Sequence, residues 1–263
     1  MATVITRVKQ KQIAQLIANE KRLDGRDLLD YREMKIEQGI IERAEGSARV
    51  VLGKTEVVVG VKIEMGEPFA DTPNEGVLTV NAELVPLASP DFEPGPPDEN
   101  SIELARIVDR GIRESKTIDV DKLVIEPGKK VFVVFVDVYV LNHDGNLIDA
   151  SALAAMAALI NTKMANYEIK EGEVKIKPGY EPLPLRKHPI TVTCAKIGDR
   201  LVVDPLREEE QVMDARISFA FDDDDNICAI QKGGSGYFEP KQVFEAAKIA
   251  KEKANQLRKK LNW

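Results

Sequence analysis

The chain has 263 residues, 43% of them hydrophobic, with a formal net charge of -7 and two cysteines. This length and composition predict a globular protein with a sizeable core, and so few cysteines exclude a disulfide framework. The longest apolar run, residues 131–140, is broken by Asp137 and is shorter than the roughly 20 residues of a membrane-spanning helix, so we expect a cytoplasmic protein with no membrane segment.

The first part of the chain is predicted to contain one helix and then several strands. Residues 7–18 have helical character, and residues 23–26 form a turn-like Leu-Asp-Gly-Arg sequence. The strands expected next are rich in β-branched residues and separated by glycines; they cover 34–41, 48–52, 55–63 and 77–85. Residues 90–100 contain four prolines, at positions 90, 94, 96 and 97, which predict an extended loop without regular pairing.

A helix with an arginine stripe is predicted after this loop, with Ser101 as its cap. Its apolar face holds Leu104, Ala105, Val108 and Ile112. At about 100° per residue, Arg106, Arg110 and Arg113 lie nearly opposite that face. A local basic stripe can contact the phosphates of a single nucleic-acid strand even though the chain as a whole is acidic.

The same arginines have a plainer explanation. Glu103 lies three residues before Arg106, and Asp109 lies four residues before Arg113. Pairs at these spacings form surface ion pairs worth only a few tenths of a kcal/mol. Spacing alone therefore leaves open whether the stripe binds a ligand or only stabilises the helix surface.

The rest of the chain repeats strands followed by a helix. A long strand is expected over 131–141, and the turn at 143–146 leads into an Ala-rich helix over 150–165, apolar nearly all round, as in helices buried between layers. Residues 168–187 contain several prolines and are expected to connect two halves. The later strands and helix are expected over 190–197, 200–204, 216–221, 226–231 and 241–261. Without strict β-α-β alternation, this order favours an α+β fold with helices packed on β-sheets.

Several segments, taken together, resemble the RNase PH family. They are Asp24-Gly25-Arg26, Gly46-Ser47-Ala48, Gly53-Lys54-Thr55, the helix over 103–113, Asp144-Gly145, and Asp204 with residues 208–210. Residues 92–106 (FEPGPPDENSIELAR) and 203–214 are similar in particular to the larger RNase PH-like subunit of the archaeal exosome ring. The resemblance implies an RNase PH-like fold with an N-terminal helical extension (1–22), a first half (23–167), a connection (168–187) and a second half with a C-terminal helix (188–263).

The resemblance also implies a reaction and partners. In this family, inorganic phosphate attacks the terminal phosphodiester of RNA and releases a nucleoside diphosphate. A subunit of the larger type alternates with a catalytic RNase PH-like subunit in a hetero-hexameric ring that carries RNA-binding cap subunits and takes single-stranded RNA. The matching arginines of that subunit face the RNA path, so Arg106 and Arg110, with Arg113 as a weaker third, are expected to bind RNA.

The phosphate site of the family is altered in this chain. Catalytic members place Gly, then Ser or Thr, then Arg after the Asp-Gly pair, at the start of the buried helix. Backbone N–H groups, a hydroxyl and a guanidinium together hold the attacking phosphate there. The corresponding residues here are Asn146, Leu147 and Ile148, and Asp149 follows. Aliphatic side chains donate no hydrogen bond, and we expect Asp149 to bring a carboxylate close to the anion position.

The acidic pair of the catalytic members resembles Asp204 and Glu210. Without phosphate, these carboxylates have no reaction to assist. The expected function is therefore a non-catalytic exosome subunit that binds single-stranded RNA and structures its partner's active site. Two alternatives stay open: a self-sufficient phosphorolytic 3'-to-5' exoribonuclease that uses other cations, such as Arg110 with Lys232, and an assembly module with no RNA role.

No cofactor or metal is expected. Cys194 and Cys228 lie far apart in apolar segments and lack the spacing of a zinc site. Residues 222–225 (Asp-Asp-Asp-Asp) are expected to be a hairpin tip and not a calcium site. Residues 233–236 (Gly-Gly-Ser-Gly) lack the Lys and Ser or Thr of a phosphate-binding loop and are expected to be a flexible connection.

Overall fold

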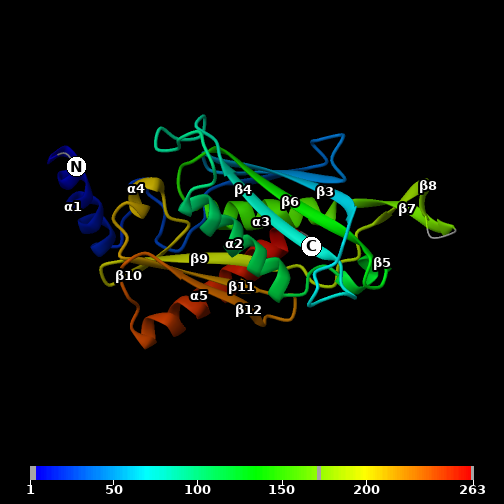
Figure 1. The fold of residues 1–263 in the computed structure, drawn as a ribbon. Coiled ribbons are helices and arrows are strands. Elements are labelled where there is room, and N and C mark those ends of the chain that lie inside the picture. Colours follow the sequence, from blue (N-terminus) through cyan, green and yellow to red (C-terminus); the bar gives the residue numbers. More distant parts are fainter. Residues whose placement is uncertain (1–3, 171–172, 262–263) are drawn as a thin grey trace.

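The computed structural model describes residues 4–170 and 173–261. It shows two large β-sheets, with helices between and outside them, and a separate two-stranded sheet (Figure 1). The first sheet has the order β1 (Met34–Gln38), β2 (Gly46–Leu52), β3 (Thr55–Gly66), β6 (Lys130–Asn142) and β4 (Val77–Leu84), with β5 (Val124–Glu126) beside β6. The second sheet has the order β10 (Arg200–Val203), β9 (Ile190–Ile197), β11 (Ala215–Phe221) and β12 (Ile227–Gly233). Among the strand pairs of the described residues, only β4 and β6 run parallel to each other.

Helices α2 (Glu99–Glu114) and α3 (Leu147–Ile160) pack against each other and against both sheets. The long helix α5 (Pro240–Leu261) packs on the other face of the second sheet, against β9 and β11. The remaining helical elements are α1 (Val4–Ala18), the 3₁₀ turn η1 (Val120–Leu123) and the short α4 (Arg207–Glu210). The α+β architecture with helices packed on sheets is therefore confirmed.

Helix α3 explains how the layers are held together. Eleven of its residues are buried, and its Ala and Leu side chains pack mainly with the inner face of the first sheet. The expectation of a helix buried between layers is confirmed, but its bounds are corrected. The helix begins at Leu147, because left-handed backbone at Gly145 and Asn146 turns the chain there, and it ends at Ile160 with Asn161 as its C-cap. Residues 163–165 belong to the next strand.

The start of α2 also differs from the expectation. Asp98 is the N-cap, and its Oδ1 atom accepts the backbone N–H of Ser101 at 2.8 Å. Ser101, expected as the cap, lies instead in the first turn of the helix. The helix begins right after the prolines of the preceding loop, and a carboxylate at its N-terminus is favoured by the partial positive charge there.

The sequence did not predict the hairpin of β7 (Lys163–Lys170) and β8 (Glu173–Pro182), which projects from the body of the molecule (Figure 1). Much of it lies in residues 168–187, which were expected only as a connection. Two prolines lie within β8, and a strand with one free edge tolerates them because the missing N–H groups are not needed on that side.

The hairpin tip at residues 222–225 is confirmed: it joins β11 to β12. The Asp222 Oδ1 atom accepts the backbone N–H groups of Asp224 and Asn226, so it stabilises the turn. Within the described ranges, no group of three or more His, Cys, Asp and Glu side chains is placed to hold a metal ion. No helix in the same ranges is both long and apolar enough to cross a membrane.

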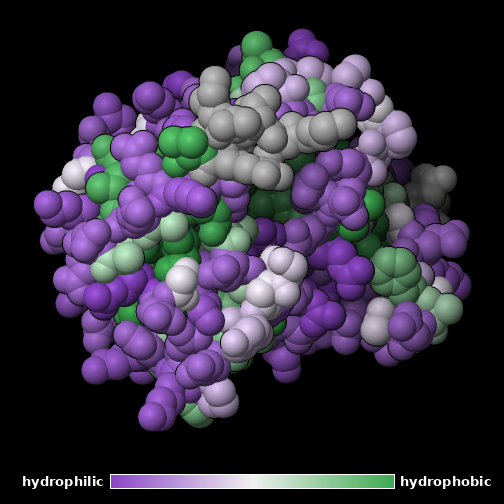
Figure 2. All heavy atoms as spheres, turned by 90° about the vertical axis from the view of Figure 1, so that its left-hand side faces the viewer, coloured by the Kyte–Doolittle hydropathy of each residue, from purple (hydrophilic) through white to green (hydrophobic). Residues whose placement is uncertain are grey.

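The side of the molecule that carries α1 and α4 is mainly hydrophilic, with apolar residues in scattered patches (Figure 2). Beneath this surface, Ile13 and Ile17 of α1 are buried against Ile197 and Val202 of the second sheet. Helix α1 also contacts α4, where Lys9 pairs with Glu208 at 3.1 Å. The N-terminal helix therefore covers the short helix that carries the acidic side chains of the candidate site.

Candidate functional site

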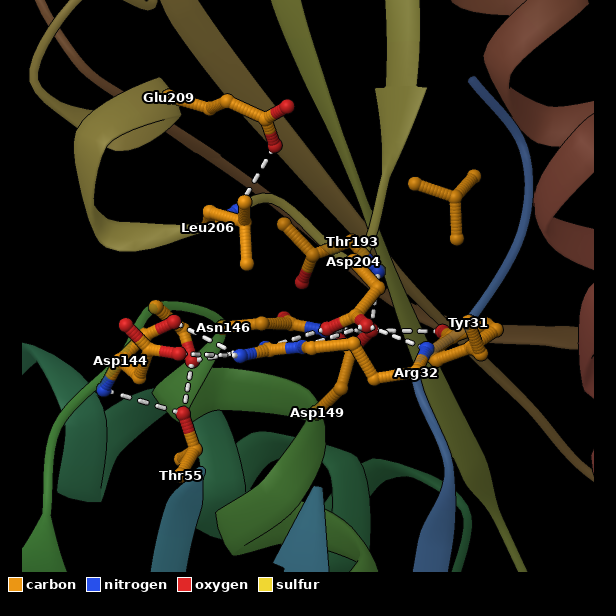
Figure 3. A network of polar contacts seen from close by, with 12 residues as sticks. Tyr31, Arg32, Thr55, Asp144, Asn146, Asp149, Thr193, Asp204, Leu206 and Glu209 are labelled. Atoms are coloured by element: carbon orange, nitrogen blue, oxygen red, sulfur yellow. Dashed lines mark hydrogen bonds and ion pairs between the residues drawn. The ribbon is translucent and has the colours of Figure 1, made fainter. Parts of the chain in front are cut away.

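The altered phosphate positions lie at the N-terminus of α3, facing the end of β10 and the start of α4 (Figure 3). Gly145 has φ +90 and Asn146 has φ +54, and together they turn the chain from β6 into the helix. A Cβ atom on Gly145 would lie 2.3 Å from the carbonyl oxygen of Pro205. Only glycine therefore allows this turn to touch the backbone that follows β10.

Asp204 is the centre of the polar network at this junction (Figure 3). Its side chain is fully buried, and both carboxylate oxygens accept hydrogen bonds from the Arg32 guanidinium, at 2.9 and 2.7 Å. Further hydrogen bonds come from the Arg32 backbone N–H, Arg26 Nη1 and Asn146 Nδ2 at 2.8 to 2.9 Å. Burial acts to raise the pKa of Asp204, but the hydrogen bonds and charge of Arg32 outweigh it and hold the pKa below its ordinary value.

Arg32 also binds the turn before α3. Its Nη1 and Nη2 atoms donate to the carbonyl oxygens of Asp144 and Gly145, at 2.7 and 3.2 Å. One guanidinium therefore bridges the turn before α3 and the carboxylate of Asp204. This bridge connects the two sheets at this point. The planar five-donor geometry of arginine suits such a bridge, and lysine could not reproduce it.

A second buried ion pair supports the first. The Arg22 guanidinium binds both carboxylate oxygens of Glu209, at 3.0 and 2.6 Å, and both side chains are fully buried. Arg22 also donates to the carbonyl oxygens of Val203 and Asp204, at 3.0 and 2.7 Å. The segment that follows α1, the end of β10 and helix α4 are thus fixed relative to one another.

Glu210 covers the N-terminus of α3. Its Oε1 atom accepts the backbone N–H of Asn146 at 2.8 Å, so a carboxylate from the chain itself takes a donor that an anion at this helix end would use. Burial raises the pKa of Glu210 to about 7, against the opposing effect of the Asn146 hydrogen bond. This contact joins residues 64 positions apart, and no local pattern in the sequence predicts it.

Asp149 was expected to bring a carboxylate close to the anion position, and it lies in the first turn of α3. Its side chain is buried, and its Oδ2 atom accepts hydrogen bonds from Tyr31 Oη at 2.7 Å, Asn146 Nδ2 at 3.0 Å and the Thr193 backbone N–H at 3.2 Å. It faces strand β9, so its side chain points between the layers. Burial raises its pKa to about 6. The carboxylate that occupies the helix end is that of Glu210.

Leu147 and Ile148 extend the hydrophobic core. Ile148 is buried, and Leu147 is half-buried against the core between the first sheet and α3. The four residues from Asn146 to Asp149 therefore present no hydroxyl and no guanidinium. The structure places Asn146, Leu147, Ile148, Asp204 and Glu210 together at the junction.

The three arginines of α2 are exposed but differ in their partners. Among the described residues, no hydrogen bond or ion pair involves Arg106, because the Glu103 carboxylate instead pairs with Arg216 at 2.5 Å. In the described part of the chain, the one partner of Arg110 is Glu114, at a long distance of 3.8 Å. Simple surface pairing therefore does not account for these two arginines.

Arg113 is held in place by its own partners. It binds Asp109 through two hydrogen bonds, at 3.0 and 2.7 Å, and donates to the Leu78 carbonyl oxygen at 3.0 Å. The hydrogen bonds and charge of Asp109 raise its pKa. The plainer explanation, a surface ion pair, thus fits Arg113.

Comparisons with known proteins agree with this architecture. Residues 30–165 match domain 1 of the 3' exoribonuclease family, RNase PH, and residues 187–253 match domain 2 of the same family. The chain is 54% identical over 260 residues to the "Exosome complex component Rrp42" of Thermococcus kodakarensis, with 98% of this chain and 96% of the relative covered. The protein of the same name from Pyrococcus furiosus is 53% identical over 258 residues, with 97% and 93% covered.

Two solved structures have the same fold. One is described as "archaeoglobus fulgidus exosome with RNA bound to the active site", with a TM-score of 0.90, 48% identity, and coverage of 98% of this chain and 100% of that chain. The other is described as "Archaeal exosome core", with a TM-score of 0.87, 45% identity, and coverage of 99% and 98%. The RNase PH-like fold expected from the sequence is thereby confirmed.

The Arg32–Asp204 contact can be tested with the substitution Asp204→Asn. Asparagine accepts the left-handed backbone at this position, where φ is +50, so the change removes mainly the charge. Because it leaves the nearly buried Arg32 guanidinium without its carboxylate, we expect the free energy of unfolding to fall by roughly 3 kcal/mol in urea titrations. Asp24→Asn, which breaks the more exposed pair with Arg26, is the matched control and should cost less than about 1 kcal/mol. Equal losses in the two variants would contradict the special role of Asp204.

Proposed function

Because this chain belongs to the 3' exoribonuclease family of RNase PH proteins, we propose that it is a non-catalytic subunit of an archaeal-type exosome. In this role it binds single-stranded RNA and structures the active site of a catalytic RNase PH-like partner. The single observation that carries the proposal is the state of the α3 N-terminus, where Glu210 already accepts the Asn146 N–H and residues 146–149 supply no hydroxyl and no guanidinium.

The chemistry of phosphorolysis supports this assignment. The reaction needs a bound phosphate positioned for attack, and a negatively charged nucleophile needs cations and N–H donors around it. At the junction, the guanidinium of Arg32 is bound to Asp204 and to two carbonyl oxygens, so it is already occupied. Lys232 of the alternative phosphate site donates to the Gly234 carbonyl oxygen at 2.6 Å. These contacts favour the non-catalytic role over a self-sufficient exoribonuclease.

RNA binding is assigned to Arg106 and Arg110, which are exposed one turn apart on α2 with little competition from carboxylates of their own chain. The distance between successive phosphates of an extended strand is similar to the distance between two guanidiniums one helical turn apart. The two side chains can therefore contact neighbouring phosphates. Arg113 contributes less, since Asp109 and Leu78 already bind it.

The proposed partners follow from the relatives. Proteins similar over nearly the whole chain are named exosome complex components, and the similar solved structures are described as archaeal exosome assemblies. The proposal places this chain in a cytoplasmic hetero-hexameric ring that alternates it with a catalytic RNase PH-like subunit and carries RNA-binding cap subunits. The two family domains, at residues 30–165 and 187–253, support division of the chain into two halves.

The lack of turnover is directly measurable. We expect the isolated chain, incubated with single-stranded RNA and inorganic phosphate, to release no nucleoside diphosphate, because the α3 N-terminus cannot hold the nucleophile. The complex with the catalytic partner, assayed by the same chromatography of nucleotides, is the positive control. Robust release by the isolated chain would instead support the self-sufficient exoribonuclease.

The RNA role is tested by replacing Arg106 and Arg110 with alanine in the complex formed with the catalytic partner. Losing about two phosphate contacts should weaken single-stranded RNA binding and make the slope of log K against log salt shallower by about 1.4. The control removes Lys259 and Lys260, two exposed cations of α5, and should leave the slope nearly unchanged. Equal slopes for wild type and the α2 double variant would favour a pure assembly module.

A further inference from the structure

A groove of about 680 Å³ lies between the edge of the first sheet and the proline-rich loop. One wall is formed by side chains of β4 and β6, among them Glu83, Asp137 and Tyr139, and the other by the loop, with Phe92 and Glu93. Glu83 is directly opposite Tyr139 in the sheet register. These strand residues alternate with buried ones such as Ala82 and Val138, so they point to the face of the sheet opposite α2 and α3.

Every charged residue that lines this groove is acidic. The five are Glu83, Asp91, Glu93, Asp98 and Asp137. Asp91 pairs with Arg207 outside the groove, and Asp98 caps α2. Within the described parts of the chain, Glu83 and Glu93 have no ion-pair partner, and Asp137 accepts only the amide of Asn81 at 3.0 Å. The groove therefore keeps uncompensated negative charge.

Tyr139 lies within this negative field. Tyr139 is 41% exposed, while its neighbours Val138 and Val140 in the same strand are buried. Burial of part of the ring, together with the charges of Asp137 and Glu83, raises its pKa. The ring is exposed and lies between the carboxylates of Asp137 and Glu83. This arrangement favours binding of a guanidinium, which can stack on the ring while donating hydrogen bonds to the carboxylates.

The surroundings restrict the kind of ligand. RNA is a polyanion and would be repelled from these carboxylates. The acidic side chains are also not gathered as a metal site within the described ranges. The loop wall contributes Phe92 and the prolines at 94, 96 and 97, so an occupant meets apolar surface as well as charge. An extended peptide segment with basic side chains matches both features.

We propose that this acidic groove binds an extended, arginine-bearing segment of another protein chain, with a guanidinium on the ring of Tyr139 between Glu83 and Asp137. The assignment rests on charge complementarity and on the open face of β4 and β6. It does not depend on the RNA role of α2 or on the loss of the phosphate site.

Binding can be measured by fluorescence anisotropy with a labelled hexa-arginine peptide and a hexa-lysine peptide of equal length. We expect the wild-type chain to prefer hexa-arginine. The double variant Glu83→Gln/Asp137→Asn should weaken hexa-arginine binding by about tenfold or more, since it removes both carboxylates that flank the ring. Tyr139→Leu should reduce the preference for arginine over lysine, because an aliphatic side chain offers no ring on which the planar guanidinium can stack.

The matched control is Glu245→Gln/Glu252→Gln on α5, which removes two exposed carboxylates elsewhere and should change the affinity by less than about twofold. Thermal unfolding of each variant checks that the fold is kept. Equal binding by the groove variant and the control would mean that the peptide binds the acidic surface in general, and the proposal would fail. Displacement of the peptide by spermine at equal concentration would assign the groove to a small polyamine and would also overturn it.

Discussion

The contact between Arg32 and Asp204 determines the arrangement of this molecule. Both carboxylate oxygens of Asp204 are bound by one guanidinium, which also holds the carbonyl oxygens of Asp144 and Gly145 at the start of α3. A buried charge is tolerated only when it is paired and its remaining hydrogen-bonding positions are filled, and this network meets that condition for Asp204. The turn before α3 and the end of β10 are therefore fixed together, and the two sheets meet in one geometry.

That geometry decides what the α3 N-terminus can do. Fixing the end of β10 also fixes α4, and α4 brings the Glu210 carboxylate to the backbone N–H of Asn146. A carboxylate of the chain itself can complement the partial positive charge of a helix N-terminus in the same way as a bound anion does. With Leu147 and Ile148 packed into or against the core, residues 146–149 supply neither a hydroxyl nor a guanidinium at this helix end. The exposed arginines of α2 lie outside this network and stay available.

Much of the fold could be predicted from the sequence, because its signals are local. Helix α3 is apolar on all sides, and β2, β3 and β6 contain runs of β-branched residues. Each of these patterns lies within one element and can be recognised without knowing its partners. The hairpin of β7 and β8 was missed, since its strands carry prolines and many charges. Helix α4 has four residues, too few for a helical repeat. The partners of Arg32 and Glu210 were also missed, because these contacts join residues 172 and 64 positions apart and no local pattern encodes them.

The central claim, that the chain's own side chains have replaced the phosphate site, is tested most directly by a crystal structure of the protein grown in inorganic phosphate. We expect no phosphate at residues 146–149, with the Glu210 carboxylate still accepting the Asn146 N–H. A phosphate ion bound at the α3 N-terminus, with the Glu210 side chain displaced, would contradict the account.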